Sequence, residues 1–129
     1  MHAVEFILYV ENQSRARDFY ATVLATPPSL DVPGMTEFDL GHATLGLMPG
    51  PGMVTLLNGQ IELGVGPRCE LYLRRTDADQ ALARVVQAGG RLLSEPLPRS
   101  WGETVGYASD LDGHILAFAA VASRASTAC

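Results

Sequence analysis

The stretch that decides the fold is Tyr107-Ala108-Ser109-Asp110-Leu111-Asp112-Gly113-His114-Ile115-Leu116-Ala117-Phe118-Ala119, two apolar runs joined by an Asp/Gly segment. Asp110 and Asp112 can accept hydrogen bonds from nearby backbone amides, and Gly113 can adopt a positive φ without a Cβ clash. The flanking runs have the length and composition of strands. The stretch therefore predicts a tight β-hairpin.

An earlier segment has the same layout. Glu37-Phe38-Asp39-Leu40-Gly41-His42-Ala43-Thr44-Leu45-Gly46-Leu47 also places Asp-Leu and Gly-His before a strand of alternating small and large apolar residues. Upstream of each hairpin, Glu5-Phe6-Ile7-Leu8 matches Glu70-Leu71-Tyr72-Leu73. The chain is therefore predicted to contain two copies of one unit.

Hydrophobic periodicity gives each copy the order βαβββ. In the first copy the elements are expected at 5–10, 14–24 (with Ser14 as N-cap), 29–32, 35–40 and 44–48. In the second they are expected at 70–74, 78–86 (capped by Thr76 or Asp77 and ended by Gly89-Gly90), 91–94 and the hairpin 104–120, with a Pro-containing loop at 95–102. One domain, 1–129, would comprise module one (1–48), a connector (49–68) with a helical turn at 53–57, module two (69–122) and a tail (123–129).

Such a chain has an α+β fold. One helix covers only one face of a four-stranded sheet, so two paired βαβββ modules would form a curved mixed sheet around a shared cavity. That cavity is the expected functional site.

Composition excludes several partners. The formal net charge of −5 and the pI near 5.0 leave no basic stripe for nucleic acid. The longest apolar run, 115–122, is too short to span a membrane, and no segment resembles a signal peptide. Cys69 and Cys129 lack paired spacing, which favours a reducing compartment. We therefore expect a cytoplasmic protein with neither nucleic-acid nor membrane partners.

The order and spacing of several motifs resemble the vicinal oxygen chelate superfamily, which includes glyoxalases, bleomycin-resistance proteins and extradiol dioxygenases. The resemblance covers almost the whole chain and rests on Val10-Glu11-Asn12, Asp18-Phe19-Tyr20, Gly34–Phe38, Leu45–Met48, Ala88-Gly89-Gly90, Arg99–Gly102 and Asp110–His114. It implies paired βαβββ modules, a small-molecule ligand and a homodimer.

The resemblance also implies a divalent metal held by strand side chains. The four family positions fall on Glu5, Gly46, Glu70 and Ala117, and glycine and alanine offer no side-chain ligand. His42 and His114 lie beside turn glycines and are expected to be exposed turn residues. We therefore expect no resident cofactor, with a weakly held divalent ion on the two glutamates as the alternative.

Strand alternation predicts which side chains face the cavity. Phe6, Leu8 and Val10 would pack under the first helix, and Phe19, Tyr20, Phe38 and Phe118 would be core. The small residues Ala117 and Ala119 would leave room for a ligand. The predicted ligand-binding set is Glu5, Ile7, Tyr9, Glu70, Tyr72, Arg74, Trp101, Tyr107 and Ala117.

Three interpretations of Glu5 and Glu70 remain open. They could be solvated or paired with Arg68 and Arg74; they could converge as a carboxylate pair whose raised pKa makes one a catalytic base; or they could attract a cation beside aromatic rings. We favour a small-molecule-binding protein that sequesters a cationic or aromatic ligand in an acidic cavity. The alternatives are a metal-dependent lyase or dioxygenase, and a metal-independent isomerase with a glutamate base.

Overall fold

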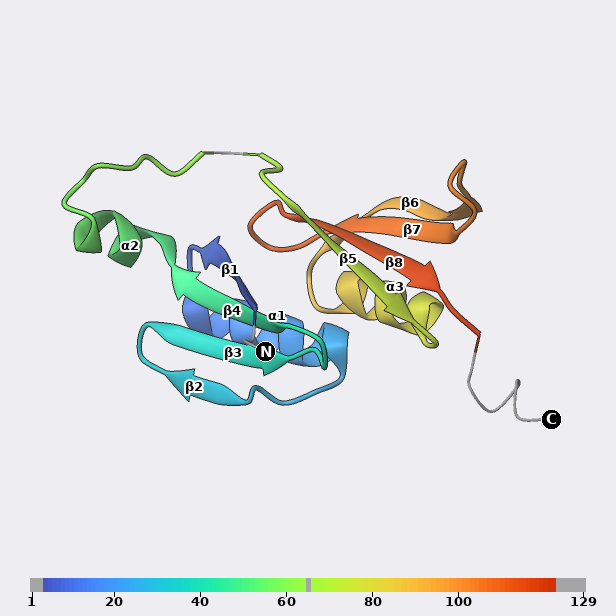
Figure 1. Ribbon diagram of the computed structural model, residues 1–129, viewed down its shortest axis with the longest axis horizontal. Coiled ribbons are helices and arrows are strands. Elements are labelled where there is room, and N and C mark those ends of the chain that lie inside the picture. Colours follow the sequence, from blue (N-terminus) through green and yellow to red (C-terminus); the bar gives the residue numbers. More distant parts are fainter. Residues whose placement is uncertain (1–3, 65, 123–129) are drawn as a thin grey trace. The chain divides into compact units, whose positions relative to one another are not determined.

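The computed structural model describes residues 4–64 and 66–122. The chain divides into two compact units, Met1–Val65 and Gly66–Cys129. Each described unit contains one four-stranded mixed sheet with a long helix against it (Figure 1). The α+β prediction with two βαβββ modules is confirmed.

In the first unit the elements are β1 (Glu5–Val10), α1 (Gln13–Leu24), β2 (Leu30–Val32), β3 (Met35–Asp39), β4 (Thr44–Pro49) and α2 (Gly50–Leu56). The sheet has the order β1-β4-β3-β2, with β1 parallel to β4 and the other neighbours antiparallel. The buried core between α1 and the sheet includes Phe19, Tyr20, Phe38, Leu45 and Leu47.

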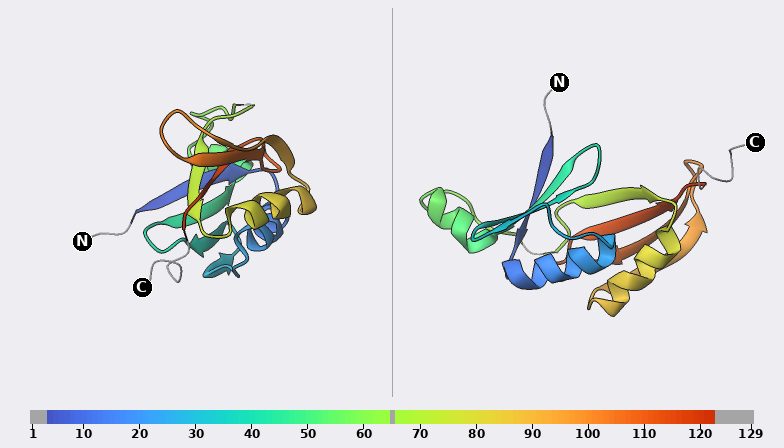
Figure 2. Two further views of the ribbon diagram at one scale, coloured as in Figure 1. Left: turned by 90° about the vertical axis from the view of Figure 1, so that its right-hand side faces the viewer. Right: turned by 90° about the horizontal axis from the view of Figure 1, so that it is seen from below.

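The second unit repeats this topology with β5 (Glu70–Arg75), α3 (Ala78–Gln87), β6 (Arg91–Pro98), β7 (Thr104–Ser109) and β8 (Ile115–Ala120). Its strand order is β5-β8-β7-β6, and β5 runs parallel to β8. Helix α3 packs along one face of this sheet, as Figure 2 shows, and buries Leu82 and Val85 while Leu116 and Phe118 are buried in β8. The sequence repeat is therefore a structural repeat.

The two hairpins close as the sequence predicts. Asp110 Oδ1 accepts hydrogen bonds from the amides of Asp112 (2.9 Å) and His114 (2.8 Å), and Gly113 has φ 87°. In the first unit Asp39 Oδ1 accepts from the amide of Gly41 at 2.8 Å, and Gly41 has φ 92°. In both turns an aspartate binds the backbone, and a glycine takes a conformation that a Cβ would strain.

Helix α1 begins two residues earlier than predicted, because Asn12 and not Ser14 is its N-cap. The Asn12 side chain accepts a hydrogen bond from the amide of Arg15 at 3.0 Å, which satisfies one of the free amides of the first turn. In α3, Asp77 occupies the N-cap position, but its carboxylate binds Arg75 and Arg84 instead of the backbone. The hydrogen bond from Arg75 holds the pKa of Asp77 well below its usual range.

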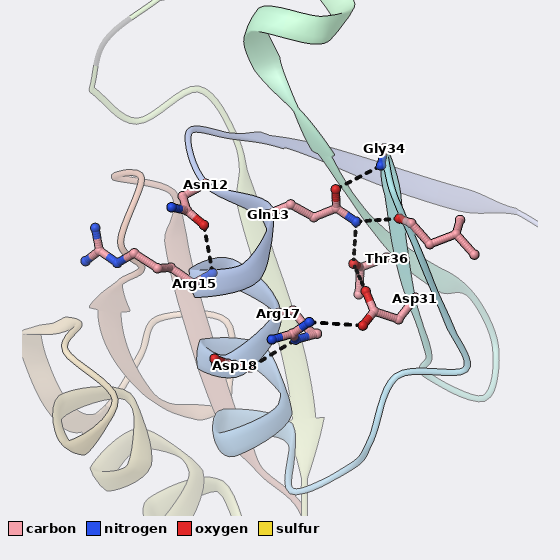
Figure 3. A network of polar contacts seen from close by, with 9 residues as sticks. Asn12, Gln13, Arg15, Arg17, Asp18, Asp31, Gly34 and Thr36 are labelled. Carbon is pink, nitrogen blue, oxygen red and sulfur yellow. Dashed lines mark hydrogen bonds and ion pairs between the residues drawn. The ribbon is translucent and has the colours of Figure 1, made fainter.

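A polar network joins α1 to the β2–β3 hairpin (Figure 3). Gln13 Nε2 donates to the carbonyl of Val32 (2.8 Å) and to Thr36 Oγ1 (2.9 Å), and Gln13 Oε1 accepts from the amide of Gly34 (2.9 Å). Thr36 is fully buried, and its hydroxyl donates to Asp31 at 2.9 Å. A single glutamine thus fixes the hairpin against the start of the helix.

Three elements differ from the sequence prediction. Strand β6 continues to Pro98, through the first half of the predicted loop; Pro96 is tolerated because β6 is an edge strand whose register shifts around it. Helix α2 covers Gly50–Leu56 instead of one turn at 53–57. Phe6 is 61% exposed and not packed under α1, because that helix lies mainly against β3 and β4.

The predicted tail, 123–129, lies outside the described residues. Within residues 4–64 and 66–122, none of the helices has the length and apolar character needed to cross a membrane.

Candidate functional site

The sheet face opposite α1 in the first unit is centred on Gly46. A Cβ at Gly46 would lie 2.4 Å from Glu5 Oε2, 2.6 Å from Ile7 Cδ1 and 3.3 Å from Met35 Sδ. Register places Ile7 and Glu37 on either side of Gly46. The Glu5 side chain therefore lies over the space that any side chain at position 46 would need.

Glu5 shares a side-chain hydrogen bond with Glu37. Desolvation, this hydrogen bond and the like charge of Glu37 raise the pKa of Glu5. Two carboxyl groups can share a hydrogen bond only when one of them carries a proton. Glu5 is thus part of a carboxyl pair, but its partner is Glu37, which the sequence analysis did not select as a site residue.

The first unit provides little positive charge to neutralise this pair. It has seven acidic residues against two arginines, Arg15 and Arg17, a net charge of −5, and the whole chain has no lysine. Both arginines belong to α1, which packs on the opposite face of the sheet. The open face of the first unit is therefore acidic.

Glu70 is the counterpart of Glu5 at the start of β5, where it pairs with Ile115 of β8 and is exposed. Its predicted convergence with Glu5 in one cavity stays a prediction. The predicted partners of these glutamates are wrong, because Arg74 pairs with Glu103, while Arg68 donates to the carbonyls of Gly66 and Asp112 and to His114.

The open face of the second unit is the sheet face opposite α3, and the position of Gly106 shows which side chains lie on it. A Cβ there would lie 2.6 Å from Leu82 Cδ2 of α3, so Gly106 faces the helix and its neighbours Val105 and Tyr107 face away. Val105, Ala117 and Ala119 form a buried cluster with Tyr72 and Tyr107 packed against it. The prediction that the alanines leave room for a ligand is wrong, because the tyrosines cover them.

Four polar side chains form one network on this face. Tyr72 Oη donates to Glu103 Oε1 at 2.6 Å and accepts from Trp101 Nε1 at 2.9 Å. Arg74 binds both carboxylate oxygens of Glu103, through Nε at 2.9 Å and Nη2 at 3.2 Å. The network links β5 to the β6–β7 connection, which carries Trp101.

The network perturbs the acid–base properties of two of its members. The hydrogen bonds from Arg74 and then Tyr72 lower the pKa of Glu103, because both favour its charged form. Desolvation and the hydrogen bond to Glu103 raise the pKa of Tyr72. At neutral pH Glu103 is therefore an ionised acceptor, and Tyr72 is a neutral donor.

Both tyrosine rings already have a guanidinium over them. Arg74 Cζ lies 4.9 Å from the centroid of the Tyr72 ring, and Arg99 Cζ lies 5.1 Å from that of Tyr107. Arg99 is itself fixed by hydrogen bonds to the carbonyl of Val105. Trp101 differs from the tyrosines because it is 54% exposed, although its indole N–H is bound.

The ligand-binding residues predicted from the sequence are thus divided between the two units. Tyr72, Arg74, Trp101, Tyr107 and Ala117 come together on the open face of the second unit, and Glu103 is the member that sequence reasoning missed. Glu5 and Ile7 lie on the open face of the first unit, and Tyr9, which is 38% exposed, follows them on β1. A carboxylate four residues before Tyr107 was the available signal for Glu103, but only the folded structure reveals its partners.

His114 is a structural residue and not the exposed turn residue that was predicted, whereas His42 is exposed as expected. His114 Nε2 lies 2.9 Å from Arg68 Nη2, and Nδ1 lies 2.9 Å from Asp110 Oδ2. Arginine can only donate, so we assign Nε2 as the acceptor and Nδ1–H as the donor to Asp110. Both ring nitrogens of His114 are therefore engaged in holding the hairpin turn.

The model of the Glyoxalase/Bleomycin resistance protein/Dioxygenase superfamily matches residues 2–118. The chain belongs to this superfamily. No curated protein matches it significantly.

Solved structures show the same fold. A glyoxalase-related enzyme from Fulvimarina pelagi has a TM-score of 0.79 and 19% identity, with coverage of 93% of this chain and 88% of that chain. Hypothetical protein SA1046 from S. aureus has a TM-score of 0.77 and 22% identity, with coverage of 94% of both chains. Protein ATC0852 from Agrobacterium tumefaciens has a TM-score of 0.69 and 27% identity, with coverage of 95% of this chain and 99% of that chain.

The superfamily metal positions do not form a complete donor set in this member. Gly46 has no side chain, and the Glu5 carboxyl occupies the adjoining space; Ala117 is fully buried beside Tyr72 and Tyr107. Within residues 4–64 and 66–122 no group of three or more His, Cys, Asp or Glu could hold a metal ion. The residues present do not fit the metal that the superfamily resemblance implies.

Proposed function

We propose that this superfamily member is a small-molecule-binding protein that sequesters an aromatic ligand, as a bleomycin-resistance protein would. The observation that carries the proposal is Trp101, a large aromatic side chain of the β6–β7 connection that is 54% exposed and is held to Tyr72 on the sheet by a hydrogen bond. A fixed, exposed ring loses little conformational entropy when a ligand stacks on it. Aromatic pairs add stacking energy to the burial of apolar surface.

The surrounding residues support this role. Tyr72 and Tyr107 fill the sheet surface beside Trp101, and Arg74 with Glu103 forms a charge pair at its edge. A ligand on Trp101 would therefore meet a firm, partly apolar surface with one neutralised acid. This arrangement suits binding without chemistry, because the Tyr72 hydroxyl, the Trp101 indole N–H and both oxygens of the Glu103 carboxylate already have partners.

Isothermal titration calorimetry with 2-naphthamide tests the proposal. Trp101→Ala should weaken binding by about 1 to 2 kcal/mol, roughly five- to thirtyfold in Kd, because it removes the stacking surface. Phe6→Ala is the matched control, since Phe6 is also an exposed aromatic residue, at 61%, but belongs to β1. Equal binding by the parent protein and Trp101→Ala would contradict the proposal.

The acidic face of the first unit supports a second candidate function. Desolvation and the neighbouring Glu37 raise the pKa of Glu5, and a carboxyl group with a raised pKa suits the general base of a metal-independent isomerase. The same acidic face could attract a cationic ligand. If the Glu5 carboxylate contacts a cation, Glu5→Gln should weaken binding of N-methylquinolinium by about 1 to 3 kcal/mol and leave binding of 2-naphthamide unchanged. Glu62→Gln is the control, and equal losses in both variants would contradict a specific role for Glu5.

A homodimer in the cytoplasm completes the proposal. The superfamily resemblance supports the dimer, and the sequence spacing of the two cysteines, which is not that of a disulfide framework, supports a reducing compartment. Size-exclusion chromatography with light scattering should give twice the chain mass of 13.8 kDa. A mass of one chain across the accessible concentration range would refute the dimer.

A further inference from the structure

The open face of the second unit has a charge preference that follows from its internal contacts. The two tyrosine rings and the Glu103 carboxylate on this face are already occupied by arginines of the same unit. Arg74 lies over Tyr72 and pairs with Glu103, and Arg99 lies over Tyr107. A cation that binds to Tyr72, Tyr107 or Glu103 would have to displace one of these guanidinium groups.

The hydrogen-bonding groups of Tyr72 and Trp101 also have partners already. The Tyr72 hydroxyl donates to Glu103 and accepts from Trp101, so neither that hydroxyl nor the indole N–H is a free donor. What remains available to a ligand is the face of the indole. Recognition of the ring is therefore by stacking and not by hydrogen bonds from Tyr72 or Trp101.

One positive group near Trp101 retains hydrogen-bonding capacity. Arg74 uses Nε and Nη2 for Glu103, its Nη1 has no partner among the described residues, and its side chain is 62% exposed. Alternation along β5 and β6 places Glu70 and Arg91 on this face as well. Glu95 lies on this face too, because its neighbour Pro96 faces α3 beside Gly106. Arg74, Arg91 and Arg99 then stand against Glu70, Glu95 and Glu103, and the preference for an anion rests on the unpartnered Nη1 of Arg74.

We propose that the open face of the second unit binds planar aromatic carboxylates, with the ring on Trp101 and the carboxylate at the free Nη1 of Arg74. This inference rests on the proposed function and names its ligand class. Charge complementarity selects the anion, because a guanidinium N–H binds a carboxylate by a charge-assisted hydrogen bond. Arg74 and Trp101 are within reach of one ligand, since both are anchored to the hydrogen-bonded Tyr72–Glu103 pair.

Three probes with the same ring test the charge preference: 2-naphthoate, 2-naphthamide and (2-naphthyl)methylammonium. Trp101 is the only tryptophan, so its indole N–H gives a single resonance in a ¹H–¹⁵N spectrum, and its shift reports binding at this face alone. The expected order of affinity is naphthoate above naphthamide above the ammonium. Each step should be about three- to tenfold in Kd, since the charges are partly exposed.

Arg74→Gln should remove the preference, with naphthoate weakened to the affinity of naphthamide and naphthamide little changed. Arg91→Gln is the matched control, because it removes the same charge from the same face without touching the Tyr72–Glu103 network, and it should retain the preference. Tightest binding of the ammonium, or an unchanged preference in Arg74→Gln, would overturn the inference. Equal binding of all three probes would overturn it while leaving aromatic binding intact, and an indole signal that none of the probes moves would refute the proposed function itself.

Discussion

Replacing Gly46 with alanine should separate the carboxyl groups of Glu5 and Glu37 in the first unit. The new Cβ would lie 2.4 Å from Glu5 Oε2 and 2.6 Å from Ile7 Cδ1, distances that require movement. Both atoms are the far ends of flexible side chains, so the cheapest response is for Glu5 to swing away from Glu37. We therefore expect Gly46→Ala to break the hydrogen bond between the two carboxyl groups.

The effect on stability should be small. Repacking Ile7 and Met35 costs about 1 kcal/mol, near the lower limit for an overpacked site, and the lost freedom of glycine in the unfolded chain offsets about 0.4 to 1 kcal/mol. The melting temperature should therefore change by only a few degrees. Gly52→Ala is the control, because a Cβ there meets nothing closer than Pro49 at 3.9 Å.

The effect on titration should be specific. In the parent protein the pKa of Glu5 lies above its ordinary value, so the folded state binds more protons than the unfolded state in that window, and some stability is lost as pH rises through it. Gly46→Ala should lower the pKa of Glu5 toward its ordinary value and reduce that loss, because it removes the contribution of Glu37 to the shift. A ¹³C titration of the Glu5 side-chain carboxyl measures both proteins. An unchanged pKa in Gly46→Ala, or an ordinary pKa in the parent, would refute the reasoning.

Three further predictions follow from other contacts. Gly106→Ala should destabilise the second unit by about 1 to 3 kcal/mol in urea unfolding, because a Cβ there would lie 2.6 Å from Leu82 and 3.2 Å from the rigid ring of Pro96; an unchanged midpoint would contradict this packing. Gln13→Ala should cost about 1 to 2 kcal/mol by the same method, since it leaves buried Thr36 without a donor; a loss no larger than that of Gln60→Ala would count against the network. Methylglyoxal and glutathione with added Ni²⁺ or Zn²⁺ should give no lactoylglutathione lyase turnover, because the metal positions lack a complete donor set, and metal-dependent turnover well above background would disprove that.

Much of the fold could be predicted from local chemistry. The Asp/Gly turns at Asp110–Gly113 and Asp39–Gly41 fix both hairpins through contacts within a few residues, and period-two alternation then fixes the strands. The start of α1 was predictable to within two residues, because Asn12 and Ser14 are both capable caps and only the final geometry decides between them.

The errors arose where distant residues decide the outcome. The predicted position of Phe6 assumed that α1 covers β1, but the helix lies mainly over β3 and β4. His114 was predicted to be exposed, but it is buried, and one of its two ring contacts is with Arg68, which is 46 residues away in the sequence. The extension of β6 through Pro96 depends on β6 being an edge strand, which no local pattern reveals.

The sequence predicted several residues of the candidate site better than it predicted the contacts between them. Tyr72, Arg74, Trp101 and Tyr107, which the sequence analysis selected, lie together in the second unit, whereas Tyr9 lies in the first; alternation along β5 and β7 places Tyr72, Arg74 and Tyr107 on one face. Glu37 and Glu103 were missed because their partners are distant in the sequence. Glu37 meets Glu5 only through the register of neighbouring strands, and Glu103 meets Tyr72 only through the path of a loop. Carboxylates are common on surfaces, and their partners have to be seen before a role can be assigned.

The most direct test of the central claim is an intermolecular nuclear Overhauser measurement on the complex with 2-naphthamide. The account predicts contacts from the naphthalene protons to the ring protons of Trp101, with none to Ile7 or Met35 on the open face of the first unit. Contacts to Ile7 or Met35 without any to Trp101 would contradict the account and place the ligand on the acidic face of Glu5 and Glu37.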